Sequence, residues 1–272
     1  MSTHAAPPPN GASLYAHPVA QAILNEALAL LGDGVPATTV EAASLAASLR
    51  SGVLAVLDDI SLETLDHALH AELHALEHAH DHGHSRDHGH DHDHGHPHHD
   101  HGPVHHDHHA HGHEHNHAPA PANPKPHAHK VKSRRMPEPA VYVLEKMAHG
   151  YRRMGRSGGA GFYDHGSEPP QLWSGLKTFE RRTAKVLEAD VVDRLRYAAM
   201  LGALRATGDA PTAALETAFG TQVPLTAEAA VSTVQSLGTE HFLARCRELA
   251  MRYGERFEPA GPTLAALGIA GH

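Results

Sequence analysis

Histidine dominates the centre of this chain of 272 residues and defines its clearest chemistry. Of its 31 histidines, 19 lie in the 38 residues from His80 to His117. Neutral imidazole binds Zn²⁺, Ni²⁺, Co²⁺ and Cu²⁺, and His-x-His and His-His spacings let neighbouring rings share one ion. The aspartates between them add oxygen ligands and compensate charge. We therefore expect the tract to bind divalent metal ions, with Zn²⁺ or Ni²⁺ as candidates, at many exchangeable sites of low selectivity.

Three further candidate ligands precede the tract. His70, His74 and His78 are four residues apart, close enough on a helix for pairs to share an ion. The candidate ligands within the tract are His80, His82, His84, His88, His90, His92, His94, His96, His98, His99, His101, His105, His106, His108, His109, His111, His113, His115 and His117. The alternative is a solvated linker that grew by repeat slippage, which would also bind metal in vitro, as a purification tag does.

The tract contains almost nothing apolar, so it cannot bury a core that offsets its ordering entropy, and we expect it to be disordered. Aromatic residues make up only 4% of the chain, while alanine and leucine are abundant, which favours an all-α fold. The expected organisation is a disordered arm (1–16), a first helical unit (17–79), a disordered His-rich linker (80–136), a connecting segment (137–188), a second helical unit (189–260) and a tail (261–272).

Apolar residues recur at helical spacing on both sides of the tract. The expected helices cover residues 19–31, 38–49, 61–78, 141–147, 190–206, 211–219 and 239–253. Thr38 followed by Glu41 fits a capping box for the second of these helices. The leucines of the third form one stripe that should face the core, and its histidines project from the other side. A faint internal repeat (helix, Gly-Asp turn, proline, helix) relates the two halves.

Bulk composition excludes several classes of protein. The formal charge is −9 with histidine counted as neutral. Protonation of about a quarter of the histidines at pH 7 would add about 7 positive charges, so the charge depends strongly on pH. No basic stripe with interleaved aromatics indicates nucleic acid, and no apolar stretch is long enough to span a membrane. The single cysteine, Cys246, rules out an internal disulfide, suits the cytoplasm, and is expected in the core.

Two motifs after the tract resemble a known family. Residues 155–163 read GRSGGAGFY and residues 172–176 read LWSGL. They resemble the GRKxGxGFY…LWPGL passage between the two C-terminal helical domains of 3-hydroxyacyl-CoA dehydrogenase in bacterial multifunctional fatty-acid oxidation proteins. Asn25-Glu26-Ala27 resembles the first such domain, and residues 250–257 (AMRYGERF) resemble the second. The resemblance covers roughly 17–78 and 137–260, and implies two helical units like the C-terminal domain of 6-phosphogluconate dehydrogenase.

The departures from that family bear on activity. In the family, an NAD-binding Rossmann domain precedes these helices and carries the catalytic histidine and glutamate. Only 16 residues precede the resembling region here, and the SGGAG at 157–161 lacks the GxGxxG spacing, so we expect no NAD site and a structural role for this loop. His17 stands where the family has an active-site asparagine, followed by Pro18 in place of arginine. We also expect no histidine–carboxylate dyad in the globular part.

The leading hypothesis is a 3-hydroxyacyl-CoA dehydrogenase C-terminal-domain protein linked to fatty-acid β-oxidation. It would be inactive alone, as a non-catalytic subunit or one completed by a partner that supplies the NAD-binding domain. Its partners would be a fatty-acid oxidation enzyme and acyl-CoA, without nucleic acid or membrane, and a homodimer is left open. The alternative is a His-rich metal-buffering or metal-chaperone protein on a borrowed helical scaffold.

Overall fold

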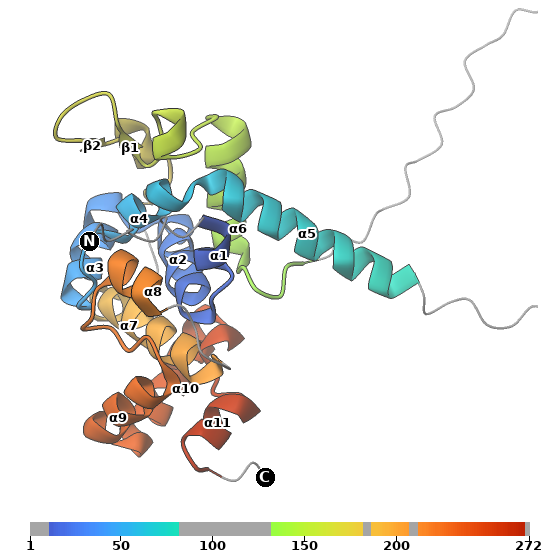
Figure 1. Cartoon of the computed structure of the whole chain (residues 1–272), viewed down its shortest axis with the longest axis vertical. Coiled ribbons are helices and arrows are strands. Elements are labelled where there is room, and N and C mark those ends of the chain that lie inside the picture. The colour runs from blue at the N-terminus through green and yellow to red at the C-terminus, as the bar shows by residue number, and fades with distance from the viewer. Residues whose placement is uncertain (1–10, 82–131, 182–185, 207–211, 270–272) are drawn as a thin grey trace, which may run out of the picture. The chain divides into compact units, whose positions relative to one another are not determined.

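The computed structural model describes residues 11–81, 132–181, 186–206 and 212–269. This part of the chain is all-α except for one hairpin whose two strands are two residues long each, which confirms the expected fold class (Figure 1). Its residues up to Ala75 and from Lys132 onward form one compact unit, and the described residues from Leu76 to Asp81 are assigned to a second unit. The expectation of a disordered arm over 1–16 is wrong for residues 11–15, which form helix α1 with Leu14 and Tyr15 buried against the core. Residues 1–10 of that arm, and residues 82–131 of the expected linker (80–136), lie outside the described residues. Among the residues that are described, no helix has the length and apolarity needed to cross a membrane.

Five helices precede the tract: α1 (Gly11–Tyr15), α2 (Pro18–Gly32), α3 (Ala37–Ala46), α4 (Val53–Ile60) and α5 (Leu62–Asp81). The connecting segment holds α6 (Glu138–Glu145), the π-helical turn η1 (Lys146–Gly150), the 3₁₀ turns η2 (Arg156–Gly158) and η3 (Ser174–Thr178), and the strands β1 (Tyr163–Asp164) and β2 (Gln171–Leu172). The last part holds α7 (Glu188–Arg205), α8 (Thr212–Phe219), α9 (Ala227–Leu237), α10 (Thr239–Tyr253), the 3₁₀ turn η4 (Glu255–Phe257) and α11 (Gly261–Ala266).

Helices α2 and α7 pack against each other at the centre of the first unit (Figure 1). They cross so closely at Gly202 that a Cβ there would lie 2.8 Å from the carbonyl oxygen of Pro18. A Cβ on Gly32 would likewise overlap the backbone of Pro139, at the start of α6. Glycine at these two positions therefore lets α2 approach both α6 and α7, and the apolar side chains around both contacts form the core.

The order of helices is the same on both sides of the tract. A long helix, two short helices and a second long helix follow one another as α2–α5 and again as α7–α10. The Gly-Asp turn and proline in the second copy of the faint sequence repeat fall within 207–211, outside the described residues. The predicted bounds of the helix at 239–253 are also those of α10, and Cys246 on this helix is buried.

The predicted capping box at Thr38 is wrong. Helix α3 begins at Ala37, its N-cap is Pro36, and no side chain caps it, so Thr38 does not form a capping box. Glu41 instead accepts a hydrogen bond from the Tyr163 hydroxyl at 2.7 Å and from the backbone N–H of Leu54 at 3.4 Å. The Glu41 side chain therefore joins distant segments of the chain rather than capping the start of α3.

The expected leucine stripe on α5 faces the core in its first half, where Leu62, Leu65 and Leu69 are buried, whereas Leu73 and Leu76 further along are half-buried. Two histidines of this helix, His67 and His70, are exposed. The helix is therefore amphipathic where it packs on the first unit, and it presents imidazole on its outer side.

A buried ion cluster ties the two halves of the first unit together. The Arg194 side chain of α7 is 0% exposed and forms ion pairs with Glu26 of α2 and, between Nη1 and Oδ2 at 2.8 Å, with Asp33. Arg256 of η4 donates from Nε to the second carboxylate oxygen of Glu26 at 2.6 Å. Burial alone would raise the pKa of Glu26, but the two guanidinium groups hold it below its ordinary value. Glu26 therefore stays ionised in the core.

Candidate functional site

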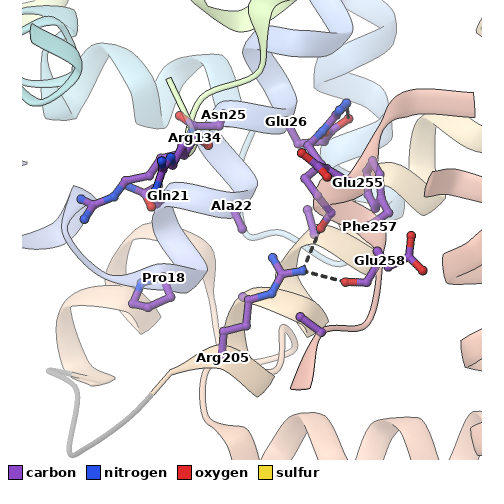
Figure 2. A pocket seen from close by; sticks show the side chains of 15 residues that line it. Pro18, Gln21, Ala22, Asn25, Glu26, Arg134, Arg205, Glu255, Phe257 and Glu258 are labelled. Carbon is purple, nitrogen blue, oxygen red and sulfur yellow. Dashed lines mark hydrogen bonds and ion pairs between the residues drawn. The ribbon is translucent and has the colours of Figure 1, made fainter. Parts of the chain in front are cut away.

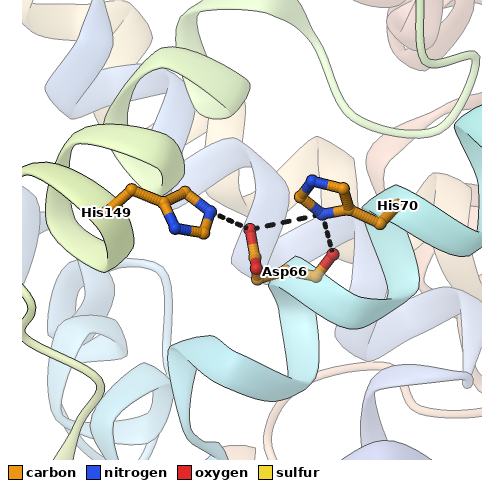
Figure 3. Close-up of side chains that lie close together, drawn as sticks. All are labelled: Asp66, His70 and His149. Carbon is orange, nitrogen blue, oxygen red and sulfur yellow. Dashed lines mark hydrogen bonds and ion pairs between the residues drawn. The ribbon is translucent and has the colours of Figure 1, made fainter.

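Asp66, His70 and His149 form a cluster of metal-ligating side chains (Figure 3). One ligand atom of each residue lies within 4.8 Å of those of the other two. Asp66 Oδ1 is 3.0 Å from His149 Nε2 and 3.5 Å from His70 Nδ1. The Asp66 side chain is 11% exposed, whereas those of His70 and His149 are 61% and 55% exposed. A largely buried carboxylate thus lies between two imidazoles that solvent can reach.

Two helices position this cluster. Asp66 and His70 are one turn apart on α5, and the His70 Nδ1 is 2.9 Å from the Asp66 carbonyl oxygen. His149 belongs to η1, the π-helical turn that continues α6. A π turn carries an extra residue compared with an α turn and is frequent at functional sites. The local widening of the helix therefore sets the direction in which His149 projects.

The structure brings only one of the three predicted helical ligands into this cluster, His70. His74 and His78 follow on the same helix and are exposed, but neither is part of the Asp66 cluster. His80 lies in the last turn of α5, and the tract ligands from His82 to His117 lie outside the described residues. Sequence reasoning missed Asp66 and His149 as ligands. The spacing of four residues between Asp66 and His70 on one helix could have indicated Asp66, but no local pattern could have revealed His149, which is 83 positions from Asp66.

His17, at the position of the family's active-site asparagine, is the N-cap of α2. Its Nδ1 accepts a hydrogen bond from the backbone N–H of Val19 at 3.2 Å. Burial lowers the pKa of His17, which keeps the ring neutral and able to accept this bond. Within the described part of the chain, the ring therefore satisfies a free N–H at the first turn of a helix.

The expectation that the globular part lacks a histidine–carboxylate dyad is wrong. One pair is His149 with Asp66, and a second is His165 with Asp58, between Nε2 and Oδ2 at 2.9 Å. Burial raises the pKa of Asp58, which is opposed by hydrogen bonds from the backbone N–H groups of Phe162 and Tyr163 and from His165. The two backbone bonds measure 2.8 and 2.9 Å.

The glycine-rich loop at 155–163 folds around this Asp58. A Cβ on Gly161 would overlap the Asp58 carboxylate, and one on Gly155, whose φ is +115°, would lie 2.6 Å from the Asp58 carbonyl oxygen. Two backbone N–H groups of the loop are directed at the chain's own carboxylate rather than at an external phosphate. The loop thus attaches the connecting segment to the C-terminal end of α4, which is a structural role.

A cavity of about 640 Å³ lies between α2, α7 and the segments around residues 135 and 257 (Figure 2). Arg205 on its wall donates to the carbonyl oxygens of Arg256 at 2.9 Å and Glu258 at 3.3 Å. Asn25 donates to the carbonyl oxygen of Arg135 at 3.1 Å. The guanidinium groups of Arg134 and Arg135 also line the cavity, and neither makes a hydrogen bond or ion pair with any described residue.

Two kinds of chemistry are therefore available. The Asp66 cluster offers imidazole nitrogen and carboxylate oxygen, which are ligands for a divalent cation. The cavity offers arginine side chains, which recognise phosphate and carboxylate groups. No family model matches the chain, and a search of curated proteins gives no match either, so the family resemblance depends on the residues quoted above.

Proposed function

We propose that this chain is the helical part of a 3-hydroxyacyl-CoA dehydrogenase-type protein linked to fatty-acid β-oxidation. It acts in the cytoplasm as a non-catalytic subunit, or as one completed by an NAD-binding partner. The observation that carries the proposal is that the two resembling motifs contact each other. Tyr163 pairs with Leu172 in the β1–β2 hairpin, and the Trp173 backbone N–H donates to the Phe162 carbonyl oxygen at 2.8 Å.

The cavity supports an acyl-CoA ligand for this subunit. A CoA thioester combines anionic phosphates with an apolar acyl chain. Arg134 and Arg135 can pair with phosphate oxygens, because a guanidinium group forms strong, charge-assisted and often bidentate hydrogen bonds with phosphate. Ala22 and Ala260, which also line the cavity and are at least partly exposed, offer apolar surface. The cavity thus offers both the cationic and the apolar contacts that a CoA thioester could use.

Acetoacetyl-CoA binding to the pure, metal-free chain tests this proposal by calorimetry. We expect binding without metal, and no oxidation of NADH when the chain is alone. The double variant Arg134→Ala/Arg135→Ala should bind about tenfold more weakly, which corresponds to about 1.4 kcal/mol. The matched control, Arg152→Ala/Arg247→Ala, removes the same charge from exposed positions outside the cavity and should bind normally. An equal loss of acetoacetyl-CoA affinity in both double variants, or oxidation of NADH by the pure chain, would contradict the proposal.

A second candidate, metal buffering or metal delivery, is favoured by the Asp66 cluster and by the exposed histidines of α5. These place metal ligands on the folded unit, on the helix that leads into the tract. In this hypothesis the tract takes up Zn²⁺ or Ni²⁺ at many weakly selective sites, and the helical scaffold is incidental.

Titration of the full chain with Ni²⁺ and Zn²⁺ tests the second candidate. We expect graded uptake of several equivalents, and loss of most of that uptake when the tract histidines at 82–117 are replaced by asparagine at unchanged length. Binding of acetoacetyl-CoA should be unaffected by this replacement, which separates the two candidates. Uptake of no more than one equivalent by the native chain would exclude multisite buffering.

A further inference from the structure

We propose that Asp66, His70 and His149 form one ordered divalent-metal site in the folded unit, of a kind suited to Zn²⁺ and distinct from the multisite tract. The site lies outside the cavity and depends on neither proposed function. Three protein ligands with one position left for water are the arrangement of an accessible zinc site rather than of a closed structural one.

The separations of the ligand atoms agree with tetrahedral coordination. Bonds of about 2.0–2.1 Å to Zn²⁺ place neighbouring ligand atoms about 3.3 Å apart. Asp66 Oδ1 lies 3.0 Å from His149 Nε2 and 3.5 Å from His70 Nδ1. One ligand atom of each histidine also lies within 4.8 Å of that of the other. Because both imidazoles are largely exposed, small side-chain rotations can bring their nitrogens to the bonding distance.

The electrostatic environment of Asp66 favours a cation at this position. Its carboxylate is largely buried, and in the sequence Asp66 lies between Leu65 and Leu69, two leucines on the packed face of α5. Within the described residues, its ion-pair partners are the two histidines, with no lysine or arginine within ion-pair distance. Glu26, by contrast, is neutralised by arginine. A divalent ion would supply the positive charge that Asp66 lacks, in a setting where water screens the attraction weakly.

The local backbone holds the ligands in place. Two of them are fixed one turn apart by α5, and the third is fixed by the π turn η1. The hydrogen bond between His149 Nε2 and Asp66 Oδ1 already brings the two chain segments together without an ion. Binding a metal would therefore order only exposed side chains, which reduces its entropic cost.

Cobalt titration tests the site in the full-length chain with its tract histidines (82–117) replaced by asparagine, so that tract binding does not mask it. We expect one equivalent of Co²⁺, with the visible absorption bands of tetrahedral cobalt, displaced by Zn²⁺. His149→Ala and His70→Ala should each weaken binding by at least about 100-fold, more than loss of an outer-shell partner does. The matched control is His67→Ala, which removes an exposed histidine of α5 outside the cluster and should leave Co²⁺ binding unchanged. Circular dichroism must show that all variants keep the parent's thermal midpoint.

A second measurement uses the native chain. Carbethoxylation of histidine by diethyl pyrocarbonate, read by peptide mass spectrometry, should slow at His70 and His149 when Zn²⁺ is added, while exposed His241 stays reactive. The proposal is overturned if the tract-substituted chain binds no equivalent of Co²⁺, or if His149→Ala and His67→Ala bind alike. Acetoacetyl-CoA binding by the His149→Ala chain is expected to be normal, so failure of this site and failure of the acyl-CoA proposal are read separately.

Discussion

An Arg194→Ala variant should lose about 3–5 kcal/mol of unfolding free energy at neutral pH, as is typical when one partner of a buried ion pair is removed. Arg194 is fully buried between Glu26 and Asp33, so its removal leaves the Glu26 carboxylate in the core with only Arg256 as a partner. Urea unfolding followed by circular dichroism measures the change through the transition midpoint.

The pH dependence of this effect has a definite sign. The pKa of Glu26 is lowered in the folded chain, so its contribution to stability is present above its ordinary value of 4.5 and is lost as the pH falls through the folded value. The difference in unfolding free energy between Arg194→Ala and the parent should therefore shrink on acidification. A difference that grows as the pH falls would contradict this assignment.

Two companion variants separate burial from charge. Arg196→Ala removes an exposed guanidinium of the same helix, whose ion pair with Asp193 spans 3.7 Å, and should cost less than about 1 kcal/mol. The double variant Glu26→Met/Arg194→Met replaces both charges by apolar groups and should be more stable than Arg194→Ala. If Arg194→Ala and Arg196→Ala were equally stable, the buried cluster would not hold the halves together.

Substitution of Gly161 by alanine should cost about 2–3 kcal/mol, the usual scale for leaving buried polar groups without partners. The added methyl group would overlap the Asp58 carboxylate. The carboxylate must then move away from the backbone N–H groups of Phe162 and Tyr163 and from His165. Hydrogen exchange measured at the two amides should accelerate together with the loss of stability.

Gly166→Ala is the matched control for this prediction. It lies in the same segment, is exposed, and a Cβ there would meet nothing within 4 Å. Its stability should remain within about 0.5 kcal/mol of the parent, as is usual for surface positions. Unchanged amide protection at Phe162 and Tyr163 in the Gly161→Ala chain would show that Asp58 does not hold the loop.

Composition and hydrophobic periodicity predicted much of the architecture. The low aromatic content with abundant alanine and leucine favoured the all-α class, and apolar residues at helical spacing predicted the long helices α2, α5, α7 and α10 and the buried face of α5. Such spacing depends only on neighbours three and four residues away, and these remain neighbours once the helix has formed. The core position of Cys246 was predictable for the same reason.

The polar contacts were much less predictable. Asp58 accepts hydrogen bonds from amides 104 and 105 positions later, and Glu41, expected in a capping box, accepts its bond from Tyr163 across 122 positions. The Asp66–His149 contact also joins segments on either side of the tract. A local sequence pattern offers each acidic residue a nearby partner, whereas the fold provides a remote one. Prediction of these pairs requires the tertiary arrangement of the helices.

The Arg194–Glu26 pair also determines what would follow from a break in the polypeptide between the two helical halves. A cut in the tract would place Glu26 on one fragment and Arg194 on the other, and each would expose apolar surface and an uncompensated charge if they separated. The nicked protein should therefore persist as a complex of two fragments, each a poor folder by itself. The two helical halves would then behave as an obligate pair.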